Sequence, residues 1–126
     1  MKNTKFYVCP HCGNIVEMVH DAGVKPFCCG QKMNELVPNT VEASAEKHIP
    51  AVSLQGDVAE VNVGSVDHPM ADVHWIEWVQ LVTDKGSARK YLNPGEAPRV
   101  RFPLNGEKPL AVYAYCNLHG LWKVEL

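Results

Sequence analysis

The chain has 126 residues, with 46% hydrophobic residues, 21% charged residues and a formal net charge of −2. These values are typical of a globular protein, and the length suits one ordinary domain or a small domain plus a modest one. The lack of a basic excess argues against a nucleic-acid partner. No stretch reaches the length of a membrane span and the first residues contain no signal-peptide pattern, so we expect a cytoplasmic protein with no membrane partner.

The first part of the chain contains four of the five cysteines. Thiols stay reduced in the cytoplasm, and an odd count argues against full disulfide pairing, so we interpret the cysteines as metal ligands. Cys9-Pro-His-Cys12-Gly is a metal-binding turn in which glycine suits the positive φ. Cys28-Cys29 completes the pattern Cys-x2-Cys-x15-Cys-Cys. This spacing predicts a metal site with four thiolate ligands.

Residues 1–38 form a module that is too short to bury a core by itself, so a metal or a partner chain must stabilise it. We expect short strands at Phe6–Val8, at Asn14–Val19 and from Phe27. Zinc is the commoner ion at four cysteines. Adjacent residues such as Cys28-Cys29 cannot easily place both sulfurs at ideal tetrahedral angles, which favours a distorted site and iron. The spacing alone leaves zinc and iron open.

Pro38-Asn39-Thr40-Val41-Glu42 is interpreted as a domain boundary. Asn39 followed three residues later by Glu42 fits a capping box, which predicts one or two helical turns over residues 41–46. That helix would present the sequence Glu46-Lys47-His48. Pro50 disfavours its continuation.

From about residue 50 onward the sequence has the pattern of an all-β domain, with turn signals such as Asn105-Gly106 between short apolar runs. Seven strands are predicted: Pro50–Gln55, Val58–Val63, His74–Thr83, Ala88–Leu92, Arg99–Leu104, Leu110–Cys116 and Leu121–Leu126. Seven strands in about 80 residues indicate an immunoglobulin-like β-sandwich. The predicted fold is therefore mainly β, with a small metal-bound module at residues 1–38 and a seven-stranded sandwich at residues 39–126.

Alternation along the strands predicts which side chains share a face. In the strand at 74–83, His74, Ile76 and Trp78 should lie on one face, with Val79 and Leu81 on the other. In the strand at 110–116, Leu110, Val112, Ala114 and Cys116 should share a face. His74 then opens one strand and Cys116 closes another, so a metal could be held at the ends of strands.

A second group of candidate ligands centres on the turn Cys116-Asn-Leu-His119. This turn is a weak signal alone, but His48, His68 and His74 precede it near a proline or a strand end. A zinc site takes four protein ligands, or three and a water. Four imidazoles and one thiolate favour a redox metal, with iron first. We interpret His11 and His20 as surface residues.

Taken together, the motifs resemble the desulfoferrodoxin family, the two-iron form of superoxide reductase. The resemblance covers nearly the whole chain and shows no departure at a ligand position. It is carried by Cys9-Pro-His-Cys12-Gly-Asn-Ile-Val, Cys28-Cys29, Glu46-Lys47-His48-Ile-Pro, Gly64-Ser-Val-Asp-His68-Pro-Met, His74-Trp-Ile-Glu-Trp and Cys116-Asn-Leu-His119-Gly-Leu-Trp-Lys.

The resemblance implies two iron ions per chain. Residues 1–38 would form a desulforedoxin-like module that tends to dimerise, so a homodimer is expected. Residues 39–126 would form the superoxide reductase domain. The first iron would be bound by Cys9, Cys12, Cys28 and Cys29. The catalytic iron would be bound by the imidazoles of His48, His68, His74 and His119 and by the axial thiolate of Cys116.

The resemblance also implies an activity, the one-electron reduction of superoxide to hydrogen peroxide without release of oxygen. Rubredoxin or a similar small redox protein would supply the electrons. Lys47 would attract the superoxide anion, and Glu46 would occupy the open coordination position after turnover and help to expel peroxide. Whether the four-cysteine iron relays electrons or only stabilises the dimer stays open.

Two other interpretations compete with this enzyme. A small rubredoxin-like electron carrier would use only the four-cysteine iron, which gives the four histidines no common task. A zinc-stabilised binding module with an immunoglobulin-like fold would leave Cys116 unexplained.

Overall fold

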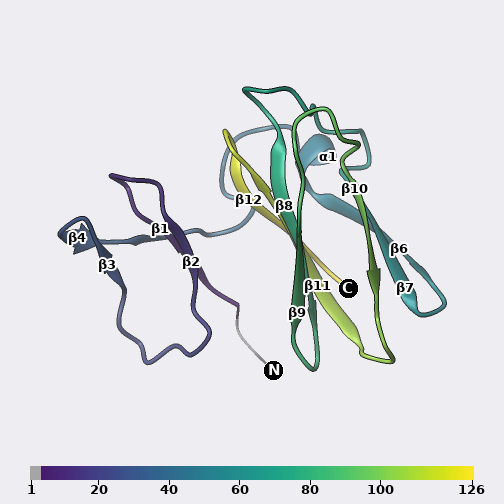
Figure 1. Ribbon diagram of the computed structural model, residues 1–126, viewed down its shortest axis with the longest axis horizontal. Helices are drawn as coiled ribbons and strands as arrows, with labels where there is room; N and C mark the ends of the chain where they lie inside the picture. The colour runs from purple at the N-terminus through teal and green to yellow at the C-terminus, as the bar shows by residue number, and fades with distance from the viewer. Residues whose placement is uncertain (1–3) are drawn as a thin grey trace. The chain divides into compact units, whose positions relative to one another are not determined.

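The structure is a computed structural model that describes residues 4–126 (Figure 1). Residues 1–3 of the predicted first module lie outside the described residues. The chain divides into two compact units, one ending at Val37 and one running from Pro38 to Leu126. Within the described residues there are twelve strands and one short helix, so the predicted mainly-β fold is confirmed. No helix in residues 4–126 has the length and apolarity to cross a membrane.

The first unit consists of short antiparallel strands around a very small core. One sheet has the order β2-β1-β5, and a separate hairpin pairs β3 with β4. Tyr7, Cys9 and Met33 are buried, and Met18 and Cys28 pack against them. The strands are β1 (Phe6–Val8), β2 (Ile15–Glu17), β3 (Phe27–Cys28), β4 (Gln31–Lys32) and β5 (Asn34–Glu35). A core of this size cannot stabilise a fold alone, and two of these five side chains are candidate metal ligands.

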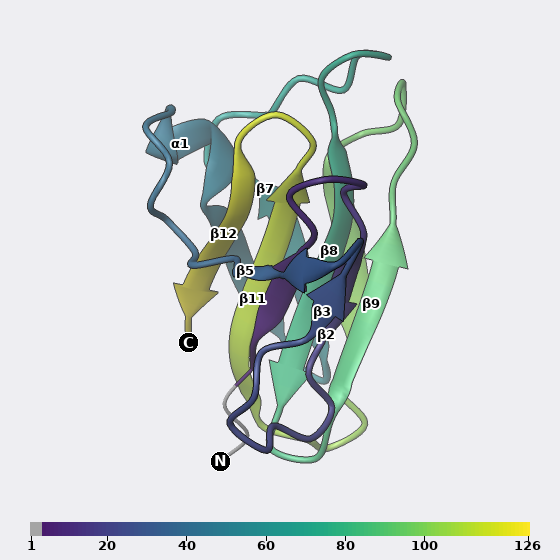
Figure 2. The ribbon, with the colours of Figure 1, turned by 90° about the vertical axis from the view of Figure 1, so that its left-hand side faces the viewer.

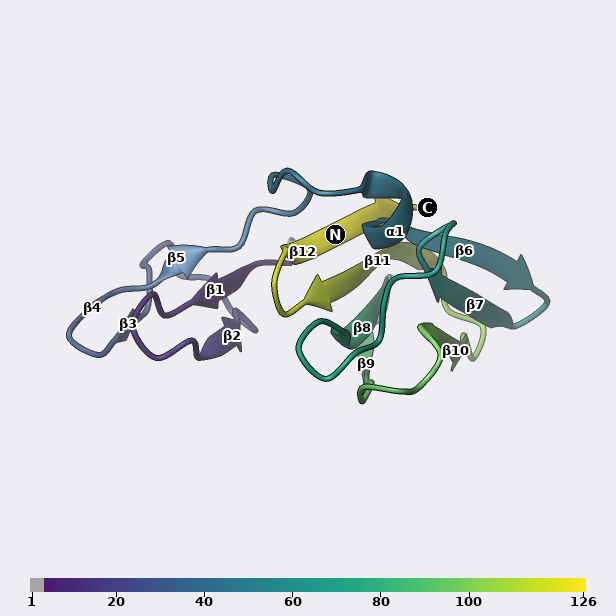
Figure 3. The same ribbon diagram turned by 90° about the horizontal axis from the view of Figure 1, so that it is seen from above.

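The second unit is the predicted seven-stranded sandwich of two antiparallel sheets (Figures 2 and 3). One sheet has the order β10-β7-β6, and the other has the order β12-β11-β8-β9. The four strands of the second sheet lie side by side in Figure 2. The elements are α1 (Ala45–His48), β6 (Pro50–Gln55), β7 (Val58–Val63), β8 (Ile76–Thr83), β9 (Ser87–Tyr91), β10 (Arg99–Pro103), β11 (Pro109–Cys116) and β12 (Gly120–Glu125). Apolar side chains from both sheets, such as Val61, Phe102 and Val112, fill the space between them.

The alternation predicted for the strand at 74–83 is wrong at one position, and a β-bulge is the reason. Ile76 is fully buried in the same core cluster as Val79, although the sequence pattern places them on opposite faces. On β11, Tyr115 pairs with Trp78 but Cys116 pairs with Ile76, so one residue of β8 has no partner. The extra residue turns the start of β8 inward. The shared face predicted for Leu110, Val112, Ala114 and Cys116 is confirmed for the last three by their burial in the core. Leu110 is only half-buried and lies at a second register shift, between Pro109 and Ala111.

The predicted capping box at Asn39 and Glu42 is also wrong. The helix α1 begins at Ala45, and its N-cap residue is Ser44, which forms no side-chain capping bond. Asn39 has a φ of 63°, whereas an N-cap residue normally has an extended backbone. The Asn39 side chain instead accepts a hydrogen bond from Lys123 N–H (2.9 Å) and donates one to Lys123 C=O (3.0 Å). These bonds fasten the segment that leads to α1 to the edge strand β12.

The loop that follows β7 packs directly against the backbone of α1. A Cβ atom on Gly64 would lie 2.6 Å from the Glu46 carbonyl oxygen and 2.8 Å from that of Ile49. The N–H of Val66 donates a hydrogen bond to Glu46 C=O (3.0 Å), and Ser65 Oγ donates another (3.2 Å). Only glycine permits this close approach, which brings the loop and the end of α1 together.

We predict that Gly64→Ala lowers the free energy of unfolding by roughly 1–3 kcal/mol, because the atoms in its way belong to backbone that cannot rotate aside. Gly86→Ala is the matched control, since a Cβ there would meet no atom within 4 Å. The measurement is urea unfolding of both variants and the parent protein at equal metal loading. Equal stability of the two variants would show that the close approach imposes no constraint.

Candidate metal centres

The four cysteines of the first unit lie together, as the sequence predicts. The sulfur atoms of Cys9, Cys12, Cys28 and Cys29 all lie within 4.8 Å of one another. Cys9 follows β1, and the turn after it is closed by a hydrogen bond from Gly13 N–H to Cys9 C=O (3.0 Å). Cys28 ends β3, and Cys29 has a φ of 53° in the turn to β4. Two turns on different hairpins therefore present their thiols to one point.

The electrostatics of these thiols suit a cation at that point. The N–H of Cys12 donates a hydrogen bond to Cys9 Sγ (3.4 Å), which lowers the pKa of Cys9 to about 6. Hydrogen bonding with the Cys12 side chain raises the pKa of Cys28 and raises that of Cys29 to about 12. Without a metal the group thus favours a thiolate at Cys9 and disfavours thiolates at Cys28 and Cys29. Four thiolates coexist only when a metal ion neutralises them, so the group fits a metal site.

The five predicted ligands of the second unit are also brought together, from α1, the loop between β7 and β8, and the end of β11 with its turn to β12. His48 is the last residue of α1, His68 lies in the loop after β7, and His74 precedes β8. Cys116 ends β11 and His119 lies in the turn to β12. The ligand atoms of His48, His68, His74 and Cys116 lie within 4.8 Å of one another. His119 Nδ1 lies 3.2 Å from His48 Nε2 and 3.9 Å from Cys116 Sγ.

The four imidazole rings form a closed, nearly square ring. Going round from His48 to His68, His74, His119 and back to His48, the centroid distances are 4.6, 4.7, 5.1 and 5.0 Å, and each pair meets edge to face. The diagonal from His48 to His74 measures 6.4 Å. Four imidazoles arranged in this way can all bind one ion.

Hydrogen bonds to backbone carbonyls fix how two of these imidazoles present their nitrogens. His48 Nδ1 lies 2.7 Å from Ser44 C=O, and His68 Nδ1 lies 2.6 Å from Pro69 C=O. A carbonyl only accepts, so Nδ1 carries the proton in both rings and Nε2 carries a lone pair. These two Nε2 atoms lie 3.1 Å apart, where two lone pairs repel. A cation between them removes the repulsion, as in metal-bound histidines whose other nitrogen is anchored.

A buried nitrogen without a partner gives a second, independent sign of a metal site. Among the buried side-chain nitrogen and oxygen atoms of the described residues, His74 Nε2 alone has no hydrogen-bond partner. Such orphaned polar atoms are rare in folded proteins and need a partner. Burial lowers the pKa of His48 and His74, and it lowers that of His68 to about 4. These three imidazoles are therefore neutral at pH 7, the form that binds metals.

Cys116 completes the group from inside the sandwich. The residue is fully buried, and burial raises the pKa of its thiol. Because the thiolate is the metal-binding form, a cation is needed to stabilise it there. The donor set is thus four imidazoles and one thiolate, which fits iron.

The residues proposed to act beside the metal lie on α1. Glu46 and Lys47 are exposed and directly precede His48. His11 and His20 are exposed and belong to neither ligand group, in agreement with their interpretation as surface residues.

Two residues beside the ligands, Trp122 and Asn117, make contacts that the sequence analysis did not predict. Trp122 is buried, but its ring also stacks on His48 at 4.8 Å, and its indole N–H donates a hydrogen bond to His119 C=O (3.1 Å). The side chain of Asn117 bonds to the peptide groups on both sides of His74. The sequence signal that could have indicated their roles is their position in the motif from Cys116 to Trp122, which contains two of the ligands.

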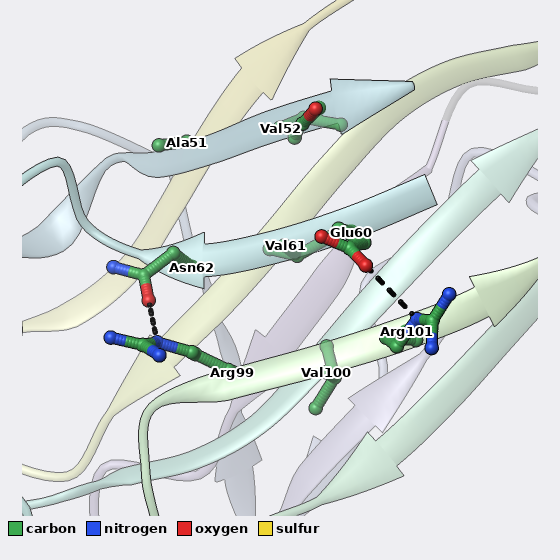
Figure 4. Close-up of a pocket in the computed structure, with 9 residues that line it drawn as sticks. Ala51, Val52, Glu60, Val61, Asn62, Arg99, Val100 and Arg101 are labelled. Atoms are coloured by element: carbon green, nitrogen blue, oxygen red, sulfur yellow. Dashed lines mark hydrogen bonds and ion pairs between the residues drawn. The ribbon is translucent and has the colours of Figure 1, made fainter. Parts of the chain in front are cut away.

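A surface hollow over β6, β7 and β10 shares no residue with either ligand group (Figure 4). Its polar side chains are already paired, since Arg99 Nε donates to Asn62 Oδ1 (2.7 Å) and Arg101 lies 3.1 Å from Glu60. It contains neither cysteine nor histidine and is lined by Ala51, Val52, Ser53, Glu60, Val61, Asn62, Arg99, Val100 and Arg101.

Comparison with known proteins places the chain in a family. The sequence model described as "Desulfoferrodoxin" matches residues 40–125, and the one described as "Desulfoferrodoxin, N-terminal domain" matches residues 2–36. The desulfoferrodoxin of Nitratidesulfovibrio vulgaris is 46% identical over 96% of this chain and 95% of its own length. That of Syntrophotalea carbinolica is 47% identical over 94% of each chain.

Solved structures agree with these relatives. The superoxide reductase from Treponema pallidum has a TM-score of 0.82 and 37% identity, and the match covers 98% of this chain and 100% of that one. The superoxide reductase (1Fe-SOR) from Giardia intestinalis has a TM-score of 0.52 and 31% identity, over 64% of this chain and 99% of its own. The four-cysteine group lies within residues 2–36 and the histidine-rich group within residues 40–125, the ranges matched by the two family models. The chain belongs to the desulfoferrodoxin family.

Proposed function

We propose that this chain is a superoxide reductase, which adds one electron and two protons to superoxide and releases hydrogen peroxide. The observation that carries the proposal is the convergence of four imidazoles and one buried thiol, with His74 Nε2 left without a hydrogen-bond partner among the described residues. The desulfoferrodoxins and superoxide reductases that the chain resembles support the same activity.

The cofactors are two iron ions per chain. Cys9, Cys12, Cys28 and Cys29 hold the first, and His48, His68, His74, His119 and Cys116 hold the second. When bound to the histidine-rich group, ferrous iron supplies the electron that superoxide accepts. The protein fixes the donor atoms beforehand: the carbonyls of Ser44 and Pro69 keep the protons of His48 and His68 on Nδ1. The buried Cys116 thiolate adds electron density from inside the domain.

Each unit has its own task in this proposal. Residues 1–38 form the desulforedoxin-like module and residues 39–126 form the superoxide reductase domain, which agrees with the unit boundary after Val37 and with the ranges of the two family matches. In the first unit Val19, Val24 and Phe27 are exposed by 86, 72 and 64%. Such apolar exposure supports an interface in a homodimer.

The electron donor that we propose is rubredoxin or a similar small redox protein, and the location is the cytoplasm. All five cysteines are free in the structure, which suits a reducing compartment.

Lys47 and Glu46 are the residues that handle the anions. Both side chains are exposed on α1 next to His48. The ammonium of Lys47 attracts the superoxide anion, and at ~5 Å in a partly screened cleft one such charge contributes on the order of 1–3 kcal/mol. After turnover the carboxylate of Glu46 would occupy the open coordination position in place of peroxide, and so help to expel it.

A second candidate function is a small rubredoxin-like electron carrier that uses the four-cysteine iron. Cys12 and Cys29 are exposed, which would allow electron exchange with a protein partner. The superoxide reaction separates the two candidates. Mixing the reduced protein with superoxide should yield one hydrogen peroxide for each superoxide consumed, with no release of dioxygen. Dioxygen release would indicate dismutation, and slow consumption of superoxide would favour the carrier.

The ligand assignment predicts the metal content of single variants. His68→Ala should retain one iron per chain, that of the four cysteines, because the histidine-rich group loses one of its donor atoms. His20→Ala should retain two, since His20 is exposed and outside both groups. Elemental analysis after anaerobic reconstitution measures both. Two tightly bound irons in His68→Ala would remove His68 from the ligand set.

The steering role predicts the kinetics of Lys47→Ile. Its second-order reaction with superoxide should slow by a factor of ~10 at low salt and lose much of its dependence on ionic strength, because local positive charge raises the encounter rate of an anion. Lys85→Ile removes the same charge at the far end of β8, roughly 25 Å along the strand from His74. Pulse radiolysis over a range of salt concentrations compares the two. Equal rate losses would show an effect of net charge only.

A further inference from the structure

The side chain of Asn117 connects the two segments that carry three of the five ligands of the histidine-rich group. Its Oδ1 accepts a hydrogen bond from Trp75 N–H (2.9 Å), and its Nδ2 donates one to Val73 C=O (3.0 Å). Its own backbone N–H also donates to Trp75 C=O (3.3 Å). The peptide groups on both sides of His74 are therefore bonded to the residue that follows Cys116.

His74 needs this external support more than its neighbours do. The rings of His48 and His68 are each anchored by a backbone carbonyl at Nδ1, whereas the ring of His74 has no hydrogen bond within the described residues. The segment around it is also poorly packed, since Val73 is 76% exposed and the strand β8 begins only at Ile76. The backbone of His74 forms a bridge with Ala71, which lies in the same loop. That bridge shapes the loop without attaching it to the turn that carries Cys116.

We infer that Asn117 is a positioning residue, which sets the His74 imidazole against Cys116 and His119. The inference rests on the proposed ligand role of His74. Asparagine suits the position because it offers one acceptor and one donor at the same time. Aspartate has the same shape but would turn a second oxygen toward the Val73 carbonyl, and alanine would remove both bonds. A ligand held by such outer contacts loses metal affinity when they are removed, typically by ~10–100-fold.

The test compares Asn117→Ala and Asn117→Asp in the full chain loaded with two irons. Asn93→Ala is the matched control, because Asn93 is an exposed asparagine whose hydrogen bond to the Glu96 side chain comes from its backbone N–H and whose own side chain bonds to none of residues 4–126. Iron release to a ferrous chelator is followed anaerobically, and the four-cysteine iron serves as an internal reference. We expect ~10–100-fold faster release from the histidine-rich group in both Asn117 variants, with unchanged release from the cysteines and unchanged behaviour of Asn93→Ala.

A second measurement follows the hydrogen bonds of the Asn117 side chain rather than the metal. Hydrogen exchange of the Trp75 amide should accelerate in Asn117→Ala, which lacks the acceptor, and stay slow in Asn117→Asp, whose carboxylate still accepts that hydrogen bond. In Asn117→Asp we therefore expect faster iron release together with slow exchange of the Trp75 amide. A general loss of stability would accelerate both.

The outcomes distinguish this inference from the proposed function. Iron release at the parent rate in both Asn117 variants, or equally accelerated release from both sites, would overturn the positioning role and leave the enzyme intact. A parent protein that takes up no iron at the histidine-rich group would overturn the proposed ligand set and the positioning role with it.

Discussion

Two imidazole nitrogens, Nε2 of His48 and Nε2 of His68, are held 3.1 Å apart with their lone pairs facing each other. Backbone carbonyls impose this arrangement, because they keep the protons on the opposite nitrogens. In a buried place such an approach is unfavourable until a cation lies between the two atoms. The fold of the second unit therefore favours metal binding, because a bound cation relieves this repulsion. The contacts described below hold the donor atoms in place.

The loops and the helix reach this arrangement through a few specific contacts. Gly64 lets the loop that carries His68 approach the backbone of α1, and Asn39 fastens the segment before α1 to β12. Asn62 donates hydrogen bonds to Gly64 C=O and to Asp67, which braces the same loop from the outer face of the sheet. Asparagine side chains recur here because an amide bonds to a peptide group as another strand would, without requiring a strand.

The two units meet the need for a metal in different ways. In the first, the buried cluster has only three residues and one of them is the ligand Cys9, so the ion contributes to the fold itself. In the second, a complete apolar core exists without any ion, and the ligands lie at one end of it, on strand ends and loops. A rigid sandwich with ligands on its loops suits catalysis, because the scaffold fixes the donor atoms.

The sequence by itself determined the mainly-β fold, the position of most strands and the identity of both ligand groups, because alternating apolar residues and cysteine or histidine spacing are local signals. It did not reveal the bulge that turns Ile76 inward, since a bulge depends on the partner strand. The sequence likewise did not reveal that Asn39 bonds to β12, because Asn39 and Glu42 fit the pattern of a helix cap. Only the tertiary structure decided how the ligands are held, because the carbonyls, Gly64 and Asn117 act between segments that are distant in the chain or through the backbone, which sequence patterns do not encode.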